Sequence, residues 1–187
     1  AEDGIRDVAV TGVQTCALPI SPNDNEQKML QAALPDDFWD TAMFAFSLMS
    51  QNARSKVFPL TLKHRVGTLM MFAVRSIFAR PQQLRDTFKQ LAAEGTVPAD
   101  LADRDNPLDF LIHESGATTL TDAAYRFVRH ERGVDVVLFG TGSPDHLKTN
   151  IESILKPPLP AGDRDRLASL FGHLLGVGLE VPPPRAK

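Results

Sequence analysis

The stretch VDVVLFGTGSPDHLKTNIESI, Val134–Ile154, decides the fold class. It predicts a short buried strand at Val136–Phe139, a turn at Gly140-Thr141-Gly142 and a helix that begins at Pro144 after the N-cap residue Ser143. The first N–H groups of such a helix have no partner within the helix, and the helix dipole favours an anion beside them. Because glycine lets a ligand approach the backbone closely, the turn is a candidate phosphate site.

The predicted helix adds two polar side chains next to this turn. His146 and Asn150 are four residues apart, so they share one helix face. A glycine turn between a strand and a helix also occurs in many α/β proteins for packing reasons alone. From the sequence of this block alone, His146 and Asn150 could either contact a ligand or be polar side chains exposed to solvent.

The first residues of the chain look foreign to the protein. VTGVQTCALPI (Val10–Ile20) and AEDGIRD (Ala1–Asp7) look like two parts of a translated sequencing-library adapter. We therefore expect residues 1–20 to be an adapter-derived scar and exclude them from the fold prediction. The alternative is that residues 1–20 are native and form a strand followed by a glycine turn. If the scar is real, the natural coding sequence is interrupted near Ser21 and its N-terminal part is missing.

Composition excludes several classes of function. The chain has 187 residues and a formal net charge of −3, which argues against a nucleic-acid surface or an anionic-membrane binder. No apolar run approaches the ~18 residues of a membrane span. The only cysteine, Cys16, falls in the adapter-like stretch, so we expect no disulfide and a cytoplasmic location. The histidines do not have metal-ligand spacing, so we expect no metal.

The rest of the chain alternates between predicted strands and helices. Two further apolar runs predict buried strands at Trp39–Phe46 and Gly67–Val74. Helical patterns cover Asn25–Leu34, Gln51–Arg65, Gln82–Ala93, Pro107–His113, Leu120–Glu131 with Thr121 as N-cap, Pro144–Leu155 and Asp163–Leu175. This order is typical of an α/β fold with a parallel sheet. Three strands are few for this length, so we expect an incomplete sheet within 21–179 and a disordered tail at 180–187.

Three runs of sequence resemble the aldo/keto reductases. They are TDAAYRFVRHERGVDVVLFGTGSPDHLKTNIESIL (Thr121–Leu155), DTAMFAFSLMSQ (Asp40–Gln51) and HRVGTLMMFAV (His64–Val74). Members of this family are (β/α)8 TIM barrels that transfer a hydride between NADPH and a carbonyl. The resemblance implies that residues 21–179 are the C-terminal part of such a barrel, about strands 6–8. It also implies NADP(H) or NAD(H) as cofactor and a small-molecule carbonyl substrate.

The resemblance further implies which residues contact the cofactor: Gly140, Thr141, Gly142, His146, Asn150, Met71 and Phe72. The turn would hold the adenosine phosphate, and Asn150 the adenine. His146 stands where many members carry an arginine that clamps the 2′-phosphate, and a neutral imidazole is a weaker clamp than a guanidinium. Met71 and Phe72 fall near the aromatic residue that stacks on the nicotinamide, although ordinary core packing is an equal alternative for them.

Two family positions differ in this sequence. Met43 replaces a usual glutamine that binds the nicotinamide amide, and Thr149 replaces a frequent glutamate.

No catalytic residue is predicted in this chain. The family uses an Asp, a Tyr proton donor, a Lys and a His from the first half of the barrel. The only tyrosine here, Tyr125, lies inside the predicted helix Leu120–Glu131, where we interpret it as a packing residue. We therefore expect the chain alone to be inactive.

Two other functions remain open. The chain could be a non-catalytic interaction module, either a small α/β domain or a helical one, and a cooperative melt of a monomer would favour this. It could also belong to another phosphate-binding barrel family, which would bind simple phosphosugars rather than an adenine dinucleotide.

Overall fold

The structure is a computed structural model that describes residues 20–21, 27–36 and 38–177. The adapter-like stretch up to residue 19 and the predicted tail at 180–187 therefore lie outside the described residues, and both assignments stay predictions.

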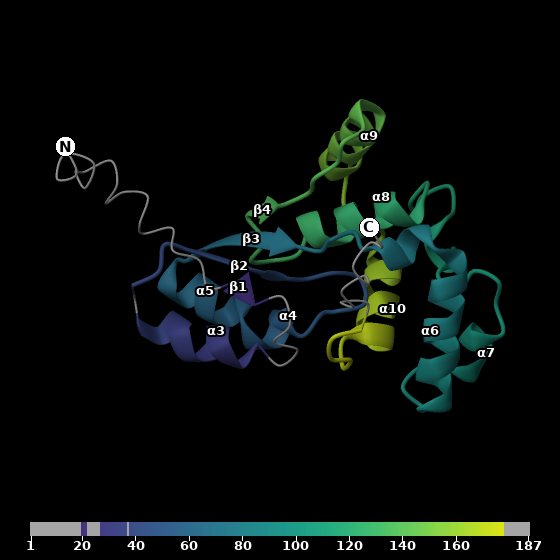
Figure 1. Ribbon diagram of the computed structural model, residues 1–187, viewed down its shortest axis with the longest axis horizontal. Helices are drawn as coiled ribbons and strands as arrows, with labels where there is room; N and C mark the ends of the chain where they lie inside the picture. Colours follow the sequence, from purple (N-terminus) through teal and green to yellow (C-terminus); the bar gives the residue numbers. More distant parts are fainter. Residues whose placement is uncertain (1–19, 22–26, 37, 178–187) are drawn as a thin grey trace, which may run out of the picture.

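A parallel sheet forms the centre of the molecule (Figure 1). Its four strands follow chain order: β1 (Ile20–Ser21), β2 (Thr41–Ala45), β3 (Gly67–Met71) and β4 (Val136–Val137). The predicted α/β class and parallel sheet are confirmed. The sheet has one strand more than the sequence predicted, because Ile20–Ser21 pairs with β2. The predicted strand at 136–139 is shorter, although the Leu138 N–H still donates to the Met70 carbonyl at 2.9 Å.

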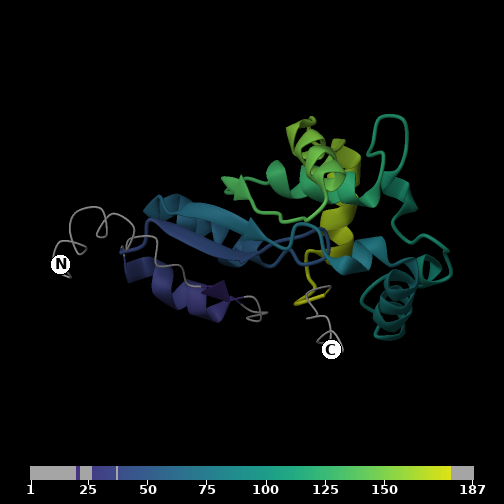
Figure 2. The ribbon, with the colours of Figure 1, turned by 45° about the horizontal axis from the view of Figure 1, so that its top comes forward.

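Eight α-helices and three 3-10 turns are described. They are α3 (Lys28–Ala33), α4 (Ala53–Lys56), α5 (Phe58–His64), α6 (Pro81–Ala93), α7 (Ala99–Ala102), α8 (Leu120–Arg129), α9 (Pro144–Leu155), α10 (Ala161–Phe171), η1 (Leu34–Asp36), η2 (Ser76–Ala79) and η3 (Asp109–Leu111). Figure 1 shows α9 standing out beyond β4, and α3 and α5 on the opposite side of the sheet. In Figure 2 the teal helices α6 and α7 again lie at the end of the molecule away from α3. The helix predicted at Pro107–His113 is only the turn η3.

Local sequence explains where the helices begin and break. Pro59 lies in the first turn of α5, so the predicted helix 51–65 divides at Val57. Ser143 caps α9 as predicted, since its Oγ accepts from the His146 N–H at 3.4 Å. The predicted cap of α8 is wrong: Thr119, not Thr121, accepts from the Asp122 N–H at 3.1 Å. Thr119 has the extended backbone that an N-cap requires.

The hydrophobic core covers one face of the sheet. Phe44 and Met70 point into it and are fully buried. Phe44 packs on Phe58 of α5, with ring centroids 5.6 Å apart, and Phe46 stacks on Phe127 of α8 at 5.8 Å. Burial of each such side chain contributes about 2 kcal/mol to stability.

A polar clamp holds β4 against β3. The Thr68 hydroxyl donates to the Gly133 carbonyl at 2.6 Å, and the Thr68 N–H donates to the Asp135 carboxylate at 2.8 Å. Gly133 has a φ of +99°, which only glycine adopts easily, and a Cβ there would lie 3.0 Å from Phe58. Gly133 does not end α8, which already stops at Arg129, but it lets the chain turn into β4.

Candidate functional site

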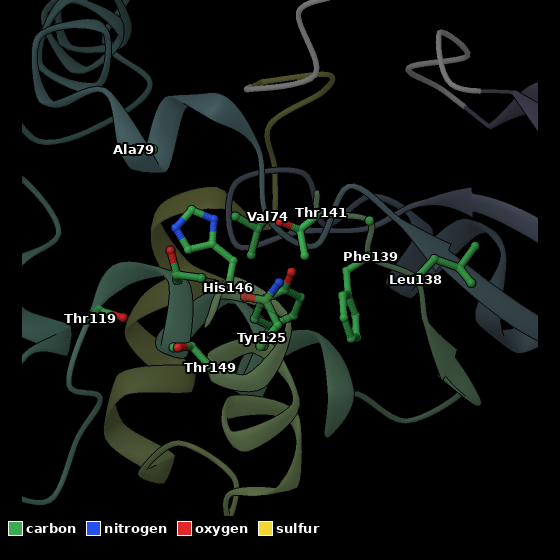
Figure 3. Close-up of a pocket in the computed structure, with 12 residues that line it drawn as sticks. Val74, Ala79, Thr119, Tyr125, Leu138, Phe139, Thr141, His146 and Thr149 are labelled. Atoms are coloured by element: carbon green, nitrogen blue, oxygen red, sulfur yellow. The ribbon is translucent and has the colours of Figure 1, made fainter. Parts of the chain in front are cut away.

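A cleft of about 510 Å³ lies at the carboxyl ends of β3 and β4. Its lining comes from four segments: Val74 and Ala79 after β3; Thr119, Thr121 and Tyr125 at the start of α8; Leu138, Phe139, Gly140 and Thr141 after β4; and His146, Thr149 and Asn150 of α9. Figure 3 shows Tyr125, Phe139, Thr141 and His146 around the same space. Ligands of parallel α/β folds bind at this end of the strands, so the cleft is the candidate site.

The glycine turn forms one wall of the cleft. Gly140 and Thr141 line it directly, and Gly142 follows them towards the start of α9. Neither glycine has a positive φ, and a Cβ on either would meet nothing within 4 Å. The fold itself therefore does not require glycine at these two positions. The open space beside them is where a ligand could approach the backbone.

Two hydrogen bonds order the turn at the start of α9. The Ser143 N–H donates to the Thr141 Oγ at 3.1 Å, and the Ser143 Oγ accepts from the His146 N–H. The Thr141 hydroxyl is thereby held as an acceptor from the backbone, so its own proton can be donated to a ligand oxygen. With twelve residues, α9 also directs the positive end of its dipole at this turn.

The first turns of α9 present polar side chains to the cleft. His146, Thr149 and Asn150 share one helix face. The Thr149 hydroxyl donates to the Asp145 carbonyl at 2.9 Å and is therefore occupied within the helix. Among the described residues, neither the Asn150 amide nor the His146 ring has a hydrogen-bond partner. These two side chains are therefore available to a ligand.

Tyr125 and Phe139 form an apolar floor. Their rings meet edge to face with centroids 5.7 Å apart, and Tyr125 is only 4% exposed. The prediction that Tyr125 packs within α8 is confirmed, but its place in the cleft was not predicted. Burial raises the pKa of the Tyr125 phenol above its ordinary value. The hydroxyl therefore stays protonated and can act only as a neutral polar group at neutral pH.

The charge around the cleft permits an anion. None of its lining residues is an aspartate or a glutamate.

The described residues contain no group of three His, Cys, Asp or Glu side chains that could hold a metal ion. No described helix is long and apolar enough to span a membrane, and the cytoplasmic location stays a prediction.

Met71 and Phe72 lie apart from the lining of the cleft. Met71 is the last residue of β3 and is half-buried. Phe72 has a φ of +64°, and the Arg75 guanidinium lies over its ring, 4.1 Å from the centroid. The structure therefore brings together Gly140, Thr141, His146 and Asn150, but not these two residues. Their contact with a nicotinamide stays a prediction.

Sequence comparisons give no family for the chain. No family model matches the sequence, and no curated protein matches it. The comparison with solved structures is more informative, because it identifies the class of fold. The chain has an α/β fold like that of the aldo-keto reductases, with a small parallel sheet.

Two of the matching structures are forms of one enzyme. They are the holo and apo forms of aldo-keto reductase AKR11C1 from Bacillus halodurans, each with a TM-score of 0.53 and 16% sequence identity. Both matches cover 81% of this chain, and they cover 48% of the holo chain and 49% of the apo chain. The chain thus spans about half the length of the structures it matches. At this identity the likeness shows the fold alone.

Proposed function

We propose that this chain carries the adenosine-phosphate end of an NAD(P)H site and is part of an aldo-keto reductase that acts on a small-molecule carbonyl. The observation that carries the proposal is the cleft itself. It joins Gly140, Thr141, His146 and Asn150 at the start of α9 and at the carboxyl end of β4. The aldo-keto reductase-like fold of the chain supports it.

The residues present fit such a cofactor. Space beside Gly140 and Gly142 accommodates a phosphate close to the backbone, and the Thr141 hydroxyl can donate to it. The Asn150 amide has both a donor and an acceptor for the edge of an adenine. The rings of Tyr125 and Phe139 offer an apolar surface beside it. When bound, the cofactor would supply the hydride.

His146 sets the affinity for a 2′-phosphate in this proposal. Its ring lines the cleft one turn from the Gly140–Gly142 turn, but a neutral imidazole is neither charged nor bidentate. We therefore propose that the site discriminates weakly between NADP(H) and NAD(H).

The acid needed for carbonyl reduction lies outside this chain in our proposal. Hydride transfer requires a proton donor for the developing alkoxide. Tyr125 is the only tyrosine, and it lies in the floor of the cleft, at the proposed adenosine end of the cofactor. The purified chain is therefore expected to bind the nucleotide without reducing a carbonyl, and turnover above a no-protein blank would contradict this.

Calorimetric titration tests the site. The wild-type chain is titrated with NADP+, NAD+, ADP-ribose and inorganic phosphate. Asn150→Ala is expected to weaken ADP-ribose binding about tenfold, because one amide contact is lost. Asn106→Ala is the matched control, since Asn106 is an exposed asparagine outside the cleft. Equal effects of both variants, or binding of phosphate alone, would contradict the proposal; phosphate alone would favour another phosphate-binding barrel.

The specificity of the same site can be changed by one substitution. His146→Arg adds a planar, permanently charged group at the position proposed to face the 2′-phosphate. We expect the affinity for NADP+ to rise about tenfold while the affinity for NAD+ stays within about twofold. An equal rise for both nucleotides would show that His146 does not face the 2′-phosphate.

A further inference from the structure

The hydroxyl of Tyr125 lacks a hydrogen-bond partner, although its side chain is almost fully buried. Tyr125 is 4% exposed, and within the part of the chain that the structure describes no donor or acceptor meets its oxygen. Buried tyrosine and tryptophan side chains usually pair their polar atom. The only tryptophan of the chain does so, because the Trp39 Nε1–H donates to the Ala33 carbonyl at 3.1 Å. The unpaired Tyr125 hydroxyl is therefore unexpected in this fold.

Packing of the ring does not account for this hydroxyl. The Tyr125 ring meets Phe139 edge to face, and a phenylalanine ring would make the same contact. The hydroxyl oxygen is not enclosed in the core either, since it is not among the fully buried side-chain oxygens without a partner, such as those of Thr41 and Ser50. Tyr125 lines the cleft (Figure 3), so the accessible part of the side chain opens into it. A ligand in the cleft could therefore supply the missing partner.

The neighbouring helix brings a second available polar group to the same cleft. α8, which carries Tyr125, packs against α9, which carries Asn150, and both residues line the cleft. The Thr149 hydroxyl is not available in the same way, because it donates to the Asp145 carbonyl at 2.9 Å. Apart from the His146 ring next to the turn, the cleft thus offers a phenol from α8 and a carboxamide from α9.

The base of a nucleotide suits these two groups better than a phosphate does. Burial raises the pKa of the Tyr125 phenol, so the group is an uncharged donor and acceptor. A phosphate is bound more favourably by the backbone N–H groups and the dipole at the start of α9. An adenine edge presents ring nitrogens that accept a hydrogen bond and an amino group that donates one. A phenol and a carboxamide can satisfy such an edge together.

We propose that the Tyr125 hydroxyl donates a hydrogen bond to the base of the bound nucleotide, beside the contact proposed for Asn150. This inference rests on the proposed function and deepens it, because it assigns a polar contact to α8 that favours ligands with a base over phosphate alone. In the free chain the hydroxyl has no partner to lose. Its removal should therefore weaken binding without weakening the fold, which a merely structural hydroxyl would not do.

Tyr125→Phe tests the proposal in the 187-residue chain, because it removes the hydroxyl and keeps the ring. In a calorimetric titration we expect the affinity for ADP-ribose to fall about tenfold. In urea, the free energy of unfolding of the free variant should be unchanged or higher. Thr149→Val is the matched control: it also removes a hydroxyl from the lining of the cleft, but one already bonded within α9, and we expect the affinity to stay within about twofold.

The outcomes separate this inference from the proposed function. A wild-type chain that does not bind ADP-ribose would overturn both. If the wild type binds, three results overturn this inference alone: an unchanged affinity of Tyr125→Phe, a loss of stability or of folding in that variant, and equal weakening by Thr149→Val. On the wild-type chain, saturating ADP-ribose should raise the pKa of Tyr125 further, because the donated hydrogen bond stabilises the protonated phenol; an unchanged titration midpoint would also contradict the inference.

Discussion

The guanidinium of Arg126 donates from Nε to the carbonyl oxygen of Pro157 at 2.7 Å. The same side chain donates from Nη1 to the Gly116 carbonyl at 2.7 Å and from Nη2 to the Pro158 carbonyl at 3.1 Å. Arg126 lies on α8 and is only 7% exposed, and Pro157 follows the end of α9. One buried cation therefore connects the two helices that line the cleft, and satisfies three backbone carbonyls.

Replacing this arginine should be costly. Arg126→Met removes the three hydrogen bonds and leaves Asp122, 3.5 Å away, without one of its cations. We expect the free energy of unfolding to fall by about 3 kcal/mol. Arg129→Met, at an exposed position of the same helix, should change it by less than about 0.5 kcal/mol. Urea unfolding of both variants measures the difference, and equal losses would contradict the role assigned to Arg126.

Asp122 should make stability depend on acid pH. Burial raises the pKa of its carboxyl, but a hydrogen bond from the Thr118 N–H and the nearby Lys156 and Arg126 cations outweigh this and lower the pKa below the ordinary 3.8. Because the folded pKa is the lower one, the ionised carboxylate stabilises the fold above about pH 3.8 and that stability is lost as the pH falls through the folded value.

The test is a pH series of melting temperatures. Asp122→Asn should be less stable than wild type at neutral pH, and its stability should fall less steeply below about pH 4. Two parallel curves over the acid range would mean that Asp122 does not contribute through its charge.

Replacing Gly133 by alanine should lower the stability of the fold, whereas replacing Gly140 by alanine should not. Gly133→Ala places a Cβ 3.0 Å from Phe58 at a φ of +99°, so we expect a loss of about 2 kcal/mol. Gly140→Ala meets nothing within 4 Å and should leave stability within about 0.5 kcal/mol while weakening nucleotide binding. Unfolding curves and nucleotide titrations separate the two effects. Strong destabilisation by Gly140→Ala would contradict the open geometry of the turn.

The only tyrosine is a probe of the cleft. The absorbance of the phenolate reports on Tyr125 alone, because the chain contains one tyrosine. Its burial raises the pKa, so the titration midpoint of the folded chain should lie above 10.0 and return towards that value in urea. A folded midpoint at or below 10.0 would show that the ring is exposed.

Local signals in the sequence predicted α9 most closely. Ser143 and Pro144 define its start, and the proline run after Leu155 defines its end, so both boundaries agree with the structure. Strand lengths were predicted less well, because pairing with neighbours decides them. β4 is only Val136–Val137, and β1 exists because Ile20–Ser21 pairs with β2.

The candidate site was predicted where it is continuous in sequence. The turn, His146 and Asn150 lie within eleven positions of one another and do line the cleft, apart from Gly142. Val74 and Phe139 join them only through the fold, and Tyr125 was recognised only as a packing residue. Phe72 shows a further limit: strand alternation predicts the direction of a side chain only while the backbone stays extended, and its φ of +64° ends that rule.

The agreement between strand order and chain order has a consequence for folding kinetics. Each pairing between the described strands joins strands that are consecutive in the sequence, so no described strand has to be inserted between two others that are already paired. Loop closure is therefore less costly than in a sheet with crossed strand order. The polypeptide can grow its sheet vectorially, one strand and its following helices at a time, in the direction of synthesis.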